Sequence, residues 1–296
     1  MKKLLGLALC TWVLIVSFTS CSASPPSAGE ADPSAASSPS SEMAAQHQGD
    51  EPVASPAAQD VPAGTVTDGE VVYGTVEGKE LTGYLAQPAG QEQAELPGLI
   101  VIQEWWGLND HIRTMTRRLA AEGYQALAVD LYDDQVATTP DQARTLVQSA
   151  LENPEQLTQN VVAAYRYLTD EHQAPKVGSI GWCFGGTWAL NTALALPADL
   201  DAAVIYYGGQ IATDRATLSP LEMPIQGHFG ELDQNPSPEQ VAAFEQSLAD
   251  LDKQAEIYLY PDAGHAFANP SGTRYSAAAA ELAWQRTVDF LKQHLT

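Results

Sequence analysis

Between residues 97 and 296, short apolar runs rich in β-branched residues alternate with segments of helical periodicity. The apolar runs predict strands at Pro97–Glu104, Tyr124–Tyr132, Lys176–Trp182, Ala202–Gly208, Met223–Gly230 and Ala255–Pro261. Runs of this kind are typical of strands buried on both faces, and strands separated by helices form parallel crossovers. Val71–Val76 and Glu80–Pro88 predict an opening hairpin. We therefore expect an α/β fold with a mainly parallel central sheet flanked by helices on both faces.

Helical segments fill the intervals between these strands. They are expected at about Asp110–Glu122, Pro140–Leu151, Pro154–Glu171, Phe184–Leu196, Pro238–Leu251 and Tyr275–His294. Asn109 or Asp110 can cap the first helix, because a short polar side chain satisfies its free amides, and Gly123 can end it. In a sheet of this kind, functional sites lie beyond the carboxyl ends of the strands.

The first 21 residues have the pattern of a bacterial export signal. Two lysines precede an apolar stretch, and small residues follow up to Cys21. The end of the segment is similar to a lipoprotein signal, in which Cys21 would carry the lipid, although Phe18 stands where such signals usually have leucine. Cleavage to a freely soluble protein is the alternative. We expect an exported lipoprotein that faces the periplasm or the cell exterior.

Residues 22–64 differ in composition from the rest of the chain. They are rich in Ser, Ala and Pro and contain no Lys, Arg, Trp, Tyr or Phe. Such a segment cannot bury enough apolar surface to offset the entropy of ordering, so we expect a disordered tether. Nothing in it indicates chemistry, including its single histidine, His47. Residues 65–296 are then expected to form one catalytic domain, which we expect to be a monomer.

Charge and cysteine content exclude several classes of partner. The formal net charge is −23, from 14 Lys+Arg against 37 Asp+Glu, which argues against nucleic acid and against anionic lipid binding by the domain itself. We therefore expect the protein to contact a membrane only through the lipid at its N-terminus. Of three cysteines, Cys10 and Cys21 belong to the signal, so Cys183 is the only thiol of the domain and cannot form an intrachain disulfide. No spacing indicates a metal or a cofactor.

Cys183 lies in the pattern G-x-C-x-G, formed by residues 181–185, after a predicted strand and before a predicted helix. This is the context of a nucleophile elbow in α/β-hydrolases, with Cys in the place of the usual Ser. The flanking glycines are needed because the turn is strained and crowded, and the helix N-terminus favours a thiolate. The alternative is a small apolar cysteine packed in the core.

The partners of such a nucleophile follow in the expected chain order. Asp233 comes just after one predicted strand and His265 after the next, so His265 would handle the thiol proton and Asp233 would orient its ring. Weaker candidates are His111, which could line the site, His228, which lies in a predicted buried strand, and His172, His294 and Asp262. The backbone amides of Trp105 and Phe184 are expected to form the oxyanion hole. Glu104 is an unusual acid at a strand end, either functional or a solvated loop residue.

The chain resembles the dienelactone hydrolase family. The matching stretches are VIQEWWGLNDHIR, AVDLY, GSIGWCFGG, GHFGELD and YPDAGHAF. The resemblance implies a Cys183–His265–Asp233 triad, with Glu104 in contact with the resting thiol. It also implies a carboxylate-bearing lactone held by two arginines. Asp134 and Asn269 stand at those two positions here, and Arg274 lies close enough in sequence to compensate with a different geometry.

We expect hydrolysis of a small ester or lactone through a thioester on Cys183, without a cofactor or a metal. Aromatic side chains are expected to line the mouth of the site, with at least half of them in the core instead. The candidates are Trp105, Trp106, Tyr132, Trp182 and Phe267. Three alternatives remain: a carboxylesterase or thioesterase for neutral substrates, a non-catalytic binding protein of the same fold, and a thiol redox sensor.

Overall fold

The computed structural model describes residues 47, 49–50, 61–92 and 94–296, which belong to one compact unit, Ser37–Thr296. The predicted export signal, the lipidation of Cys21 and most of the tether lie outside these residues. Within the part of the chain that is described, no helix combines the length and apolar character needed to cross a membrane.

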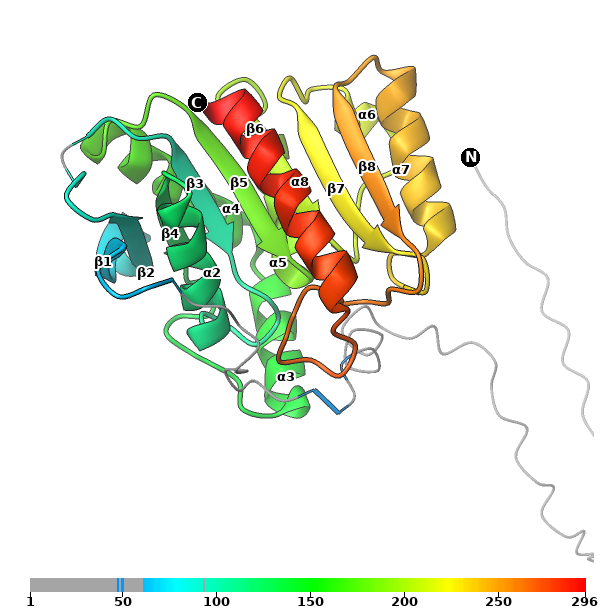
Figure 1. Ribbon diagram of the computed structural model, residues 1–296, viewed down its shortest axis with the longest axis horizontal. Coiled ribbons are helices and arrows are strands. Elements are labelled where there is room, and N and C mark those ends of the chain that lie inside the picture. The colour runs from blue at the N-terminus through cyan, green and yellow to red at the C-terminus, as the bar shows by residue number, and fades with distance from the viewer. Residues whose placement is uncertain (1–46, 48, 51–60, 93) are drawn as a thin grey trace, which may run out of the picture. The chain divides into compact units, whose positions relative to one another are not determined.

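The described residues form an eight-stranded sheet with the order β1-β2-β4-β3-β5-β6-β7-β8 (Figure 1). Its strands are β1 (Val66–Val76), β2 (Lys79–Pro88), β3 (Gly98–Ile102), β4 (Gln125–Val129), β5 (Val177–Trp182), β6 (Ala202–Tyr206), β7 (Ile225–Gly230) and β8 (Ala255–Tyr260). The strands from β3 to β8 are parallel, and the β1–β2 and β2–β4 pairs are antiparallel. The predicted α/β fold and its opening hairpin are confirmed.

A helix follows each of the parallel strands. The helices are α2 (Asp110–Ala121), α3 (Pro140–Leu151), α4 (Pro154–Arg166) with its π-helical continuation η1 (Tyr167–Glu171), α5 (Phe184–Ala195), α6 (Arg215–Leu218), α7 (Pro238–Asp250) and α8 (Ala277–Leu295). In Figure 1, α8 crosses in front of the sheet and α5 lies behind it, as expected for helices on both faces. Only the single turn α6 has no counterpart in the prediction.

The predicted start of α2 is confirmed in detail. The side chain of Asn109 accepts a hydrogen bond of 3.2 Å from the amide of Ile112, which satisfies one of the free donors of the first turn. The chain leaves the helix through Gly123, whose φ of 108° is accessible to glycine at little cost. These two local signals set the helix that follows β3.

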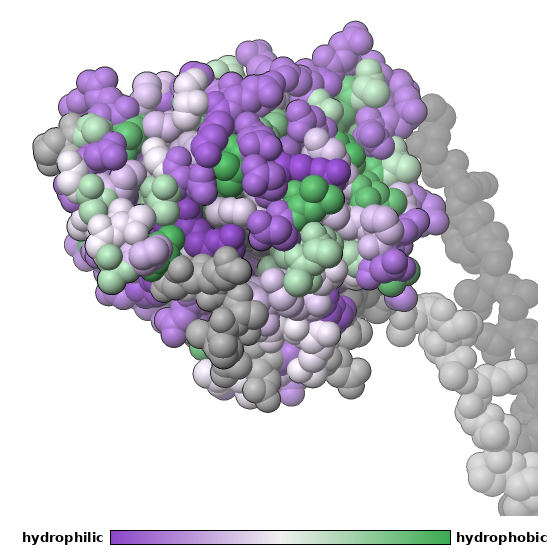
Figure 2. All heavy atoms as spheres, viewed as in Figure 1, coloured by the Kyte–Doolittle hydropathy of each residue, from purple (hydrophilic) through white to green (hydrophobic). Residues whose placement is uncertain are grey.

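Burial on both faces explains why the sequences of the central strands are almost entirely apolar. All five residues of β3 and all five of β4 are buried, because helices cover both faces of the sheet. Hydrophilic side chains cover most of the molecular face in Figure 2, in keeping with the acidic composition. The polar residues of interest are exceptions to this division, since they are buried beyond the carboxyl ends of β3, β5, β7 and β8.

The turn between β5 and α5 brings the helix very close to β3. A Cβ atom added to Gly185 would overlap the carbonyl oxygens of Ile102 and Gln103. Backbone atoms cannot move aside without displacing the strand, so this position excludes every residue except glycine.

We predict that Gly185→Ala lowers the free energy of unfolding by about 3 kcal/mol or more. For a domain of this size, that corresponds to a melting temperature about 6–12 °C lower. The control is Gly69→Ala on β1, where an added Cβ meets nothing within 4 Å. Thermal denaturation of both variants checks the prediction, and equal melting temperatures would contradict it.

Candidate active site

Cys183 occupies a strained turn between β5 and α5. Its φ of 57° and ψ of −116° lie outside the regions that ordinary residues prefer, a form of strain that is typical of a nucleophile elbow. The turn is fixed by a 3.0 Å hydrogen bond from the Cys183 amide to the carbonyl of Tyr206 on β6. The thiol itself is fully buried and forms no disulfide.

Asp233 and His265 meet beside the thiol, as the sequence predicts. Asp233 follows β7 and His265 follows β8, and these neighbouring parallel strands end at the same edge of the sheet. The Nδ1 atom of His265 lies 2.9 Å from a carboxylate oxygen of Asp233, and both side chains are buried. Because Nδ1 bonds Asp233, Nε2 of His265 is the ring nitrogen that can interact with the thiol. A nitrogen of this ring lies within 4.8 Å of Sγ of Cys183.

Electrostatics favour an ion pair between the thiol and His265. Burial alone would raise the pKa of Cys183, but the charge and hydrogen bonding of His265, followed by those of His47, lower this pKa to about 6. Burial would lower the pKa of His265, but the negative charges of Cys183 and Asp233 raise it to about 10. At neutral pH the pair is therefore a thiolate beside an imidazolium.

Glu104 is buried near the thiol but is not bonded to it. One carboxyl oxygen accepts a 2.6 Å hydrogen bond from Asn269, and the other has no hydrogen-bond partner among the described groups. The contact between Glu104 and the resting thiol that the family resemblance implies stays a prediction, since no hydrogen bond joins the two groups in the part of the chain that is described. Burial and the nearby Cys183 thiolate raise the pKa of Glu104 to about 8, so the carboxyl group is mostly protonated at neutral pH.

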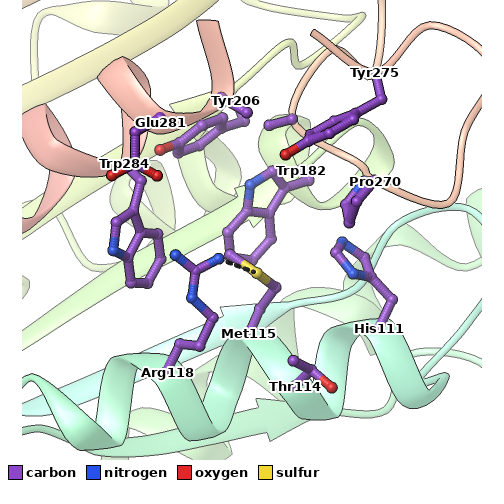
Figure 3. Close-up of a pocket in the computed structure, with 12 residues that line it drawn as sticks. His111, Thr114, Met115, Arg118, Trp182, Tyr206, Pro270, Tyr275, Glu281 and Trp284 are labelled. Carbon is purple, nitrogen blue, oxygen red and sulfur yellow. Dashed lines mark hydrogen bonds between the residues drawn. The ribbon is translucent and has the colours of Figure 1, made fainter. Parts of the chain in front are cut away.

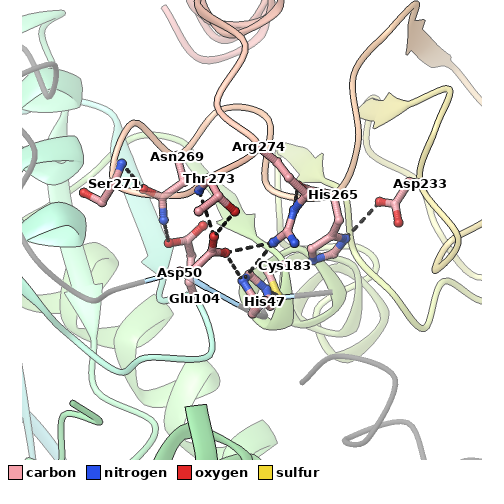
Figure 4. A network of polar contacts seen from close by, with 10 residues as sticks. All are labelled: His47, Asp50, Glu104, Cys183, Asp233, His265, Asn269, Ser271, Thr273 and Arg274. Atoms are coloured by element: carbon pink, nitrogen blue, oxygen red, sulfur yellow. Dashed lines mark hydrogen bonds and ion pairs between the residues drawn. The ribbon is translucent and has the colours of Figure 1, made fainter. Parts of the chain in front are cut away.

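A second histidine takes the place next to the thiol (Figure 4). Nε2 of His47 lies 3.5 Å from Sγ of Cys183, and its ring stacks on Trp105 with 4.4 Å between the ring centroids. Nδ1 of His47 lies 2.8 Å from a carboxylate oxygen of Asp50. The interpretation of residues 22–64 as a tether without chemistry missed this contact. The only sequence signal for this contact is that His47 stands three positions before Asp50, and this spacing is too common to predict a site.

Asp50 anchors this part of the chain. Its carboxylate accepts hydrogen bonds from the Thr273 amide (2.8 Å), the Thr273 hydroxyl (2.7 Å) and the Arg274 guanidinium (2.8 Å). Burial would raise the pKa of Asp50, but the hydrogen bonds from His47 and Thr273 hold it well below its usual range. Arg274 also donates a 2.8 Å bond to the carbonyl of His265, so it ties the anchor to the catalytic loop.

The residues expected to line a substrate mouth are largely buried. Trp106 packs edge-on against Trp105, and the ring of Tyr132 lies 5.4 Å from that of Phe184. Phe267 has no exposed surface and packs on Tyr207 and Tyr260. Their packing agrees with the expectation that at least half of these rings belong to the core, and their contact with substrate stays a prediction.

The remaining histidines lie outside the thiol cluster. His228 is fully buried in β7 and bonds Tyr260 and Gln226, as expected for a core histidine. His111 lines a cavity of about 50 Å³ between α2 and α8, together with Arg118 (Figure 3). This cavity is far smaller than the several hundred Å³ of a typical ligand site, so it is not the substrate pocket.

Comparison with known proteins agrees with this geometry. The model of the dienelactone hydrolase family matches residues 81–295. The chain belongs to the dienelactone hydrolase family. It is accordingly a hydrolase that acts on carboxylic ester bonds, with a small ester or lactone as substrate and a cysteine as nucleophile.

Relatives and solved structures of the family cover nearly all of the domain. A protein of Escherichia coli O157:H7 named "Putative carboxymethylenebutenolidase" is 34% identical over 271 residues, which cover 84% of this chain and 96% of that protein. A protein of the same name from Saccharolobus solfataricus is 30% identical over 261 residues, which cover 76% of this chain and 98% of that protein. The crystal structure of a "Putative Dienelactone Hydrolase" from Klebsiella pneumoniae is 28% identical, with a TM-score of 0.68 over 77% of this chain and 99% of that one.

We predict that the Cys183 thiol of this family member ionises with a midpoint near pH 6, against about 8.5 for an unperturbed cysteine. The ultraviolet absorbance of the thiolate, followed against pH with Cys183→Ala as the blank, measures the midpoint. Replacing His265 with Gln removes the imidazolium, so burial dominates and the midpoint moves above its wild-type value. A wild-type midpoint of 8 or higher would contradict the ion pair.

Proposed function

We propose that this enzyme hydrolyses an uncharged ester or lactone, with Cys183 as nucleophile, His265 as acid and base, and Asp233 as the group that orients His265. The observation that carries the proposal is the buried Cys183–His265–Asp233 arrangement, in which Asp233 holds the imidazole 2.9 Å away with Nε2 left for the thiol. These are the roles that acyl transfer requires of a nucleophile, a base and an orienting acid.

The thiolate of Cys183 attacks the carbonyl carbon and forms a C–S bond, and the carbonyl electrons move to the oxygen. Phe184 begins α5, so its amide has no acceptor within the helix and can donate to this oxyanion together with the amide of Trp105. The intermediate collapses with loss of the alkoxide, which takes the proton of His265. His265 then removes a proton from water, whose oxygen attacks the thioester and releases the acid.

The charge distribution favours a substrate without a carboxylate. Asp134, at one of the positions where the family resemblance implies an arginine, accepts a hydrogen bond from Thr82 in an exposed location. Asn269, at the other, donates to Glu104. Arg274 does reach the site, but the Asp50 carboxylate already pairs with it. A substrate carboxylate would have to displace that bond, whereas a neutral substrate leaves it in place.

Substrate entry requires the His47 ring to move. The thiol is fully buried with His47 against it. Asp50 is fixed by three hydrogen bonds from Thr273 and Arg274. The His47 ring is held by its contacts with Asp50, Arg274 and the thiol and by stacking on Trp105. A rotation of the His47 side chain can therefore free Sγ while the Asp50–Arg274 pair persists.

We predict that the full chain cleaves a neutral p-nitrophenyl ester faster than a carboxylated dienelactone, and that Cys183→Ala lowers kcat/KM by about 10³-fold or more because no thioester can form. Steady-state kinetics on both substrates check this. Turnover that survives unchanged in Cys183→Ala would contradict the mechanism, and faster cleavage of the dienelactone would contradict the substrate class.

A second prediction concerns the Asp50–Arg274 pair. Asp50→Asn leaves Arg274 without its counter-charge, so the ratio of kcat/KM for the carboxylated over the neutral substrate rises about tenfold, as expected for one charge-assisted hydrogen bond. Asp141→Asn is the matched control, because it removes the same charge from an exposed pair with Arg144. An unchanged ratio in Asp50→Asn would show that Arg274 is not available to substrate.

A further inference from the structure

Two histidine–carboxylate pairs converge on one thiol. Asp233 bonds Nδ1 of His265 at 2.9 Å, and Asp50 bonds Nδ1 of His47 at 2.8 Å. In both cases the carboxylate fixes the ring so that Nε2 is left for Cys183 (Figure 4). One ligand atom from each of the three residues lies within 4.8 Å of those of the other two, and all three side chains are buried.

Hydrolysis of an ester does not account for this arrangement. Acyl transfer needs one imidazole as acid and base, and His265 with Asp233 supplies it. Nε2 of His265 makes no hydrogen bond of ordinary geometry among the described groups, and it faces the Cys183 sulfur as one half of the ion pair. A cation that bound between the two rings would replace the proton on this nitrogen, which is released to solvent, and would take over the charge of the thiolate.

We propose that Cys183, His47 and His265 form a binding site for one Zn²⁺ ion or a similar thiophilic divalent cation. A thiolate and two imidazoles are ligands that zinc prefers, whereas Mg²⁺ and Ca²⁺ take oxygen. Tetrahedral zinc with usual Zn–N and Zn–S bonds places N and S about 3.6 Å apart. The 3.5 Å between Nε2 of His47 and Sγ of Cys183 already matches that edge.

The surroundings of the three ligands also suit a cation. Histidine ligands of zinc usually donate their second nitrogen to a carboxylate, which fixes the ring and raises its basicity. Asp50 and Asp233 accept hydrogen bonds from Nδ1 of His47 and of His265 in the same arrangement. The three ligands leave a fourth position for water or another donor, and they come from distant parts of the sequence, so no motif spacing reveals the site.

Metal binding and hydrolysis exclude each other at this site. A bound cation engages the sulfur that must attack the substrate and the nitrogen that must transfer the proton. The site therefore goes beyond the proposed hydrolase function, and a metal at this position is an inhibitor that a chelator reverses. His47 is the residue that separates the two activities, because it transfers no proton in the hydrolytic steps and must leave the sulfur before a substrate enters.

Cobalt(II) titration of the full chain tests the proposal. The protein is freed of metal with a chelator under reducing conditions, and Co²⁺ serves as the spectroscopic probe for Zn²⁺. We expect one equivalent of Co²⁺ to produce the near-ultraviolet charge-transfer band of a cobalt–thiolate bond, and Zn²⁺ to abolish it. His47→Ala removes a ligand and weakens binding by more than about 100-fold, and Asp50→Asn, which keeps the ring, weakens it by about 10–100-fold.

His172→Ala is the matched control, since His172 bonds Gln125 away from the cluster and its loss leaves the cobalt affinity unchanged. Circular dichroism confirms that each variant is folded. Absence of the thiolate band at one equivalent, or equal affinity in wild type, His47→Ala and Asp50→Asn, would overturn the three-ligand site. The readout is absorbance, so it is independent of whether any ester is cleaved.

Discussion

The site depends on the close approach of α5 to the sheet at the turn that carries Cys183. Gly181 and Gly185 allow backbone atoms to meet where any Cβ would overlap a carbonyl group. This contact forces Cys183 into a positive φ and puts its sulfur beyond the carboxyl end of β5, next to the first turn of a helix. The parallel register of β7 and β8 then delivers Asp233 and His265 to the same edge. If the turn adopted an unstrained conformation, the sulfur of Cys183 would no longer lie beside Asp233 and His265.

The buried carboxyl groups around the thiol differ in pKa because they differ in partners. A buried charge is tolerated only when a counter-charge and hydrogen bonds replace water. Asp50 has an arginine and three further donors, so it stays ionised. Glu104 has only the neutral amide of Asn269, which is why burial raises its pKa. One strongly polar cluster thus holds an ionised acid and a protonated acid side by side.

The sequence predicts the fold, and the edge of the sheet at which Cys183, Asp233 and His265 lie together, because these signals are local. Apolar runs and the Asn109 cap fix individual elements, and Cys183, Asp233 and His265 each follow directly on a predicted strand. His47 carries no such signal. Composition predicts the average tendency of residues 22–64 to remain unpacked, but two side chains, held by a stack and a few hydrogen bonds, are enough to dock part of that segment. The Glu104–Asn269 bond was likewise hidden, because it joins loops that only the folded sheet brings together.

The position of His47 links the two chemistries assigned to the thiol. Stacked on Trp105, its ring covers the sulfur and directs a nitrogen at it, a geometry that suits a metal ligand and obstructs an ester. Rotated away, it leaves the His265–Cys183 ion pair ready to attack. Asp50 stays bonded to Arg274 in both positions, so the change costs only the contacts of one ring. The stack of His47 on Trp105 and its hydrogen bonds to Asp50 and Cys183 each contribute on the order of 1 kcal/mol. The proposed exchange between the two positions is then within reach of thermal motion, and a bound cation would hold the first.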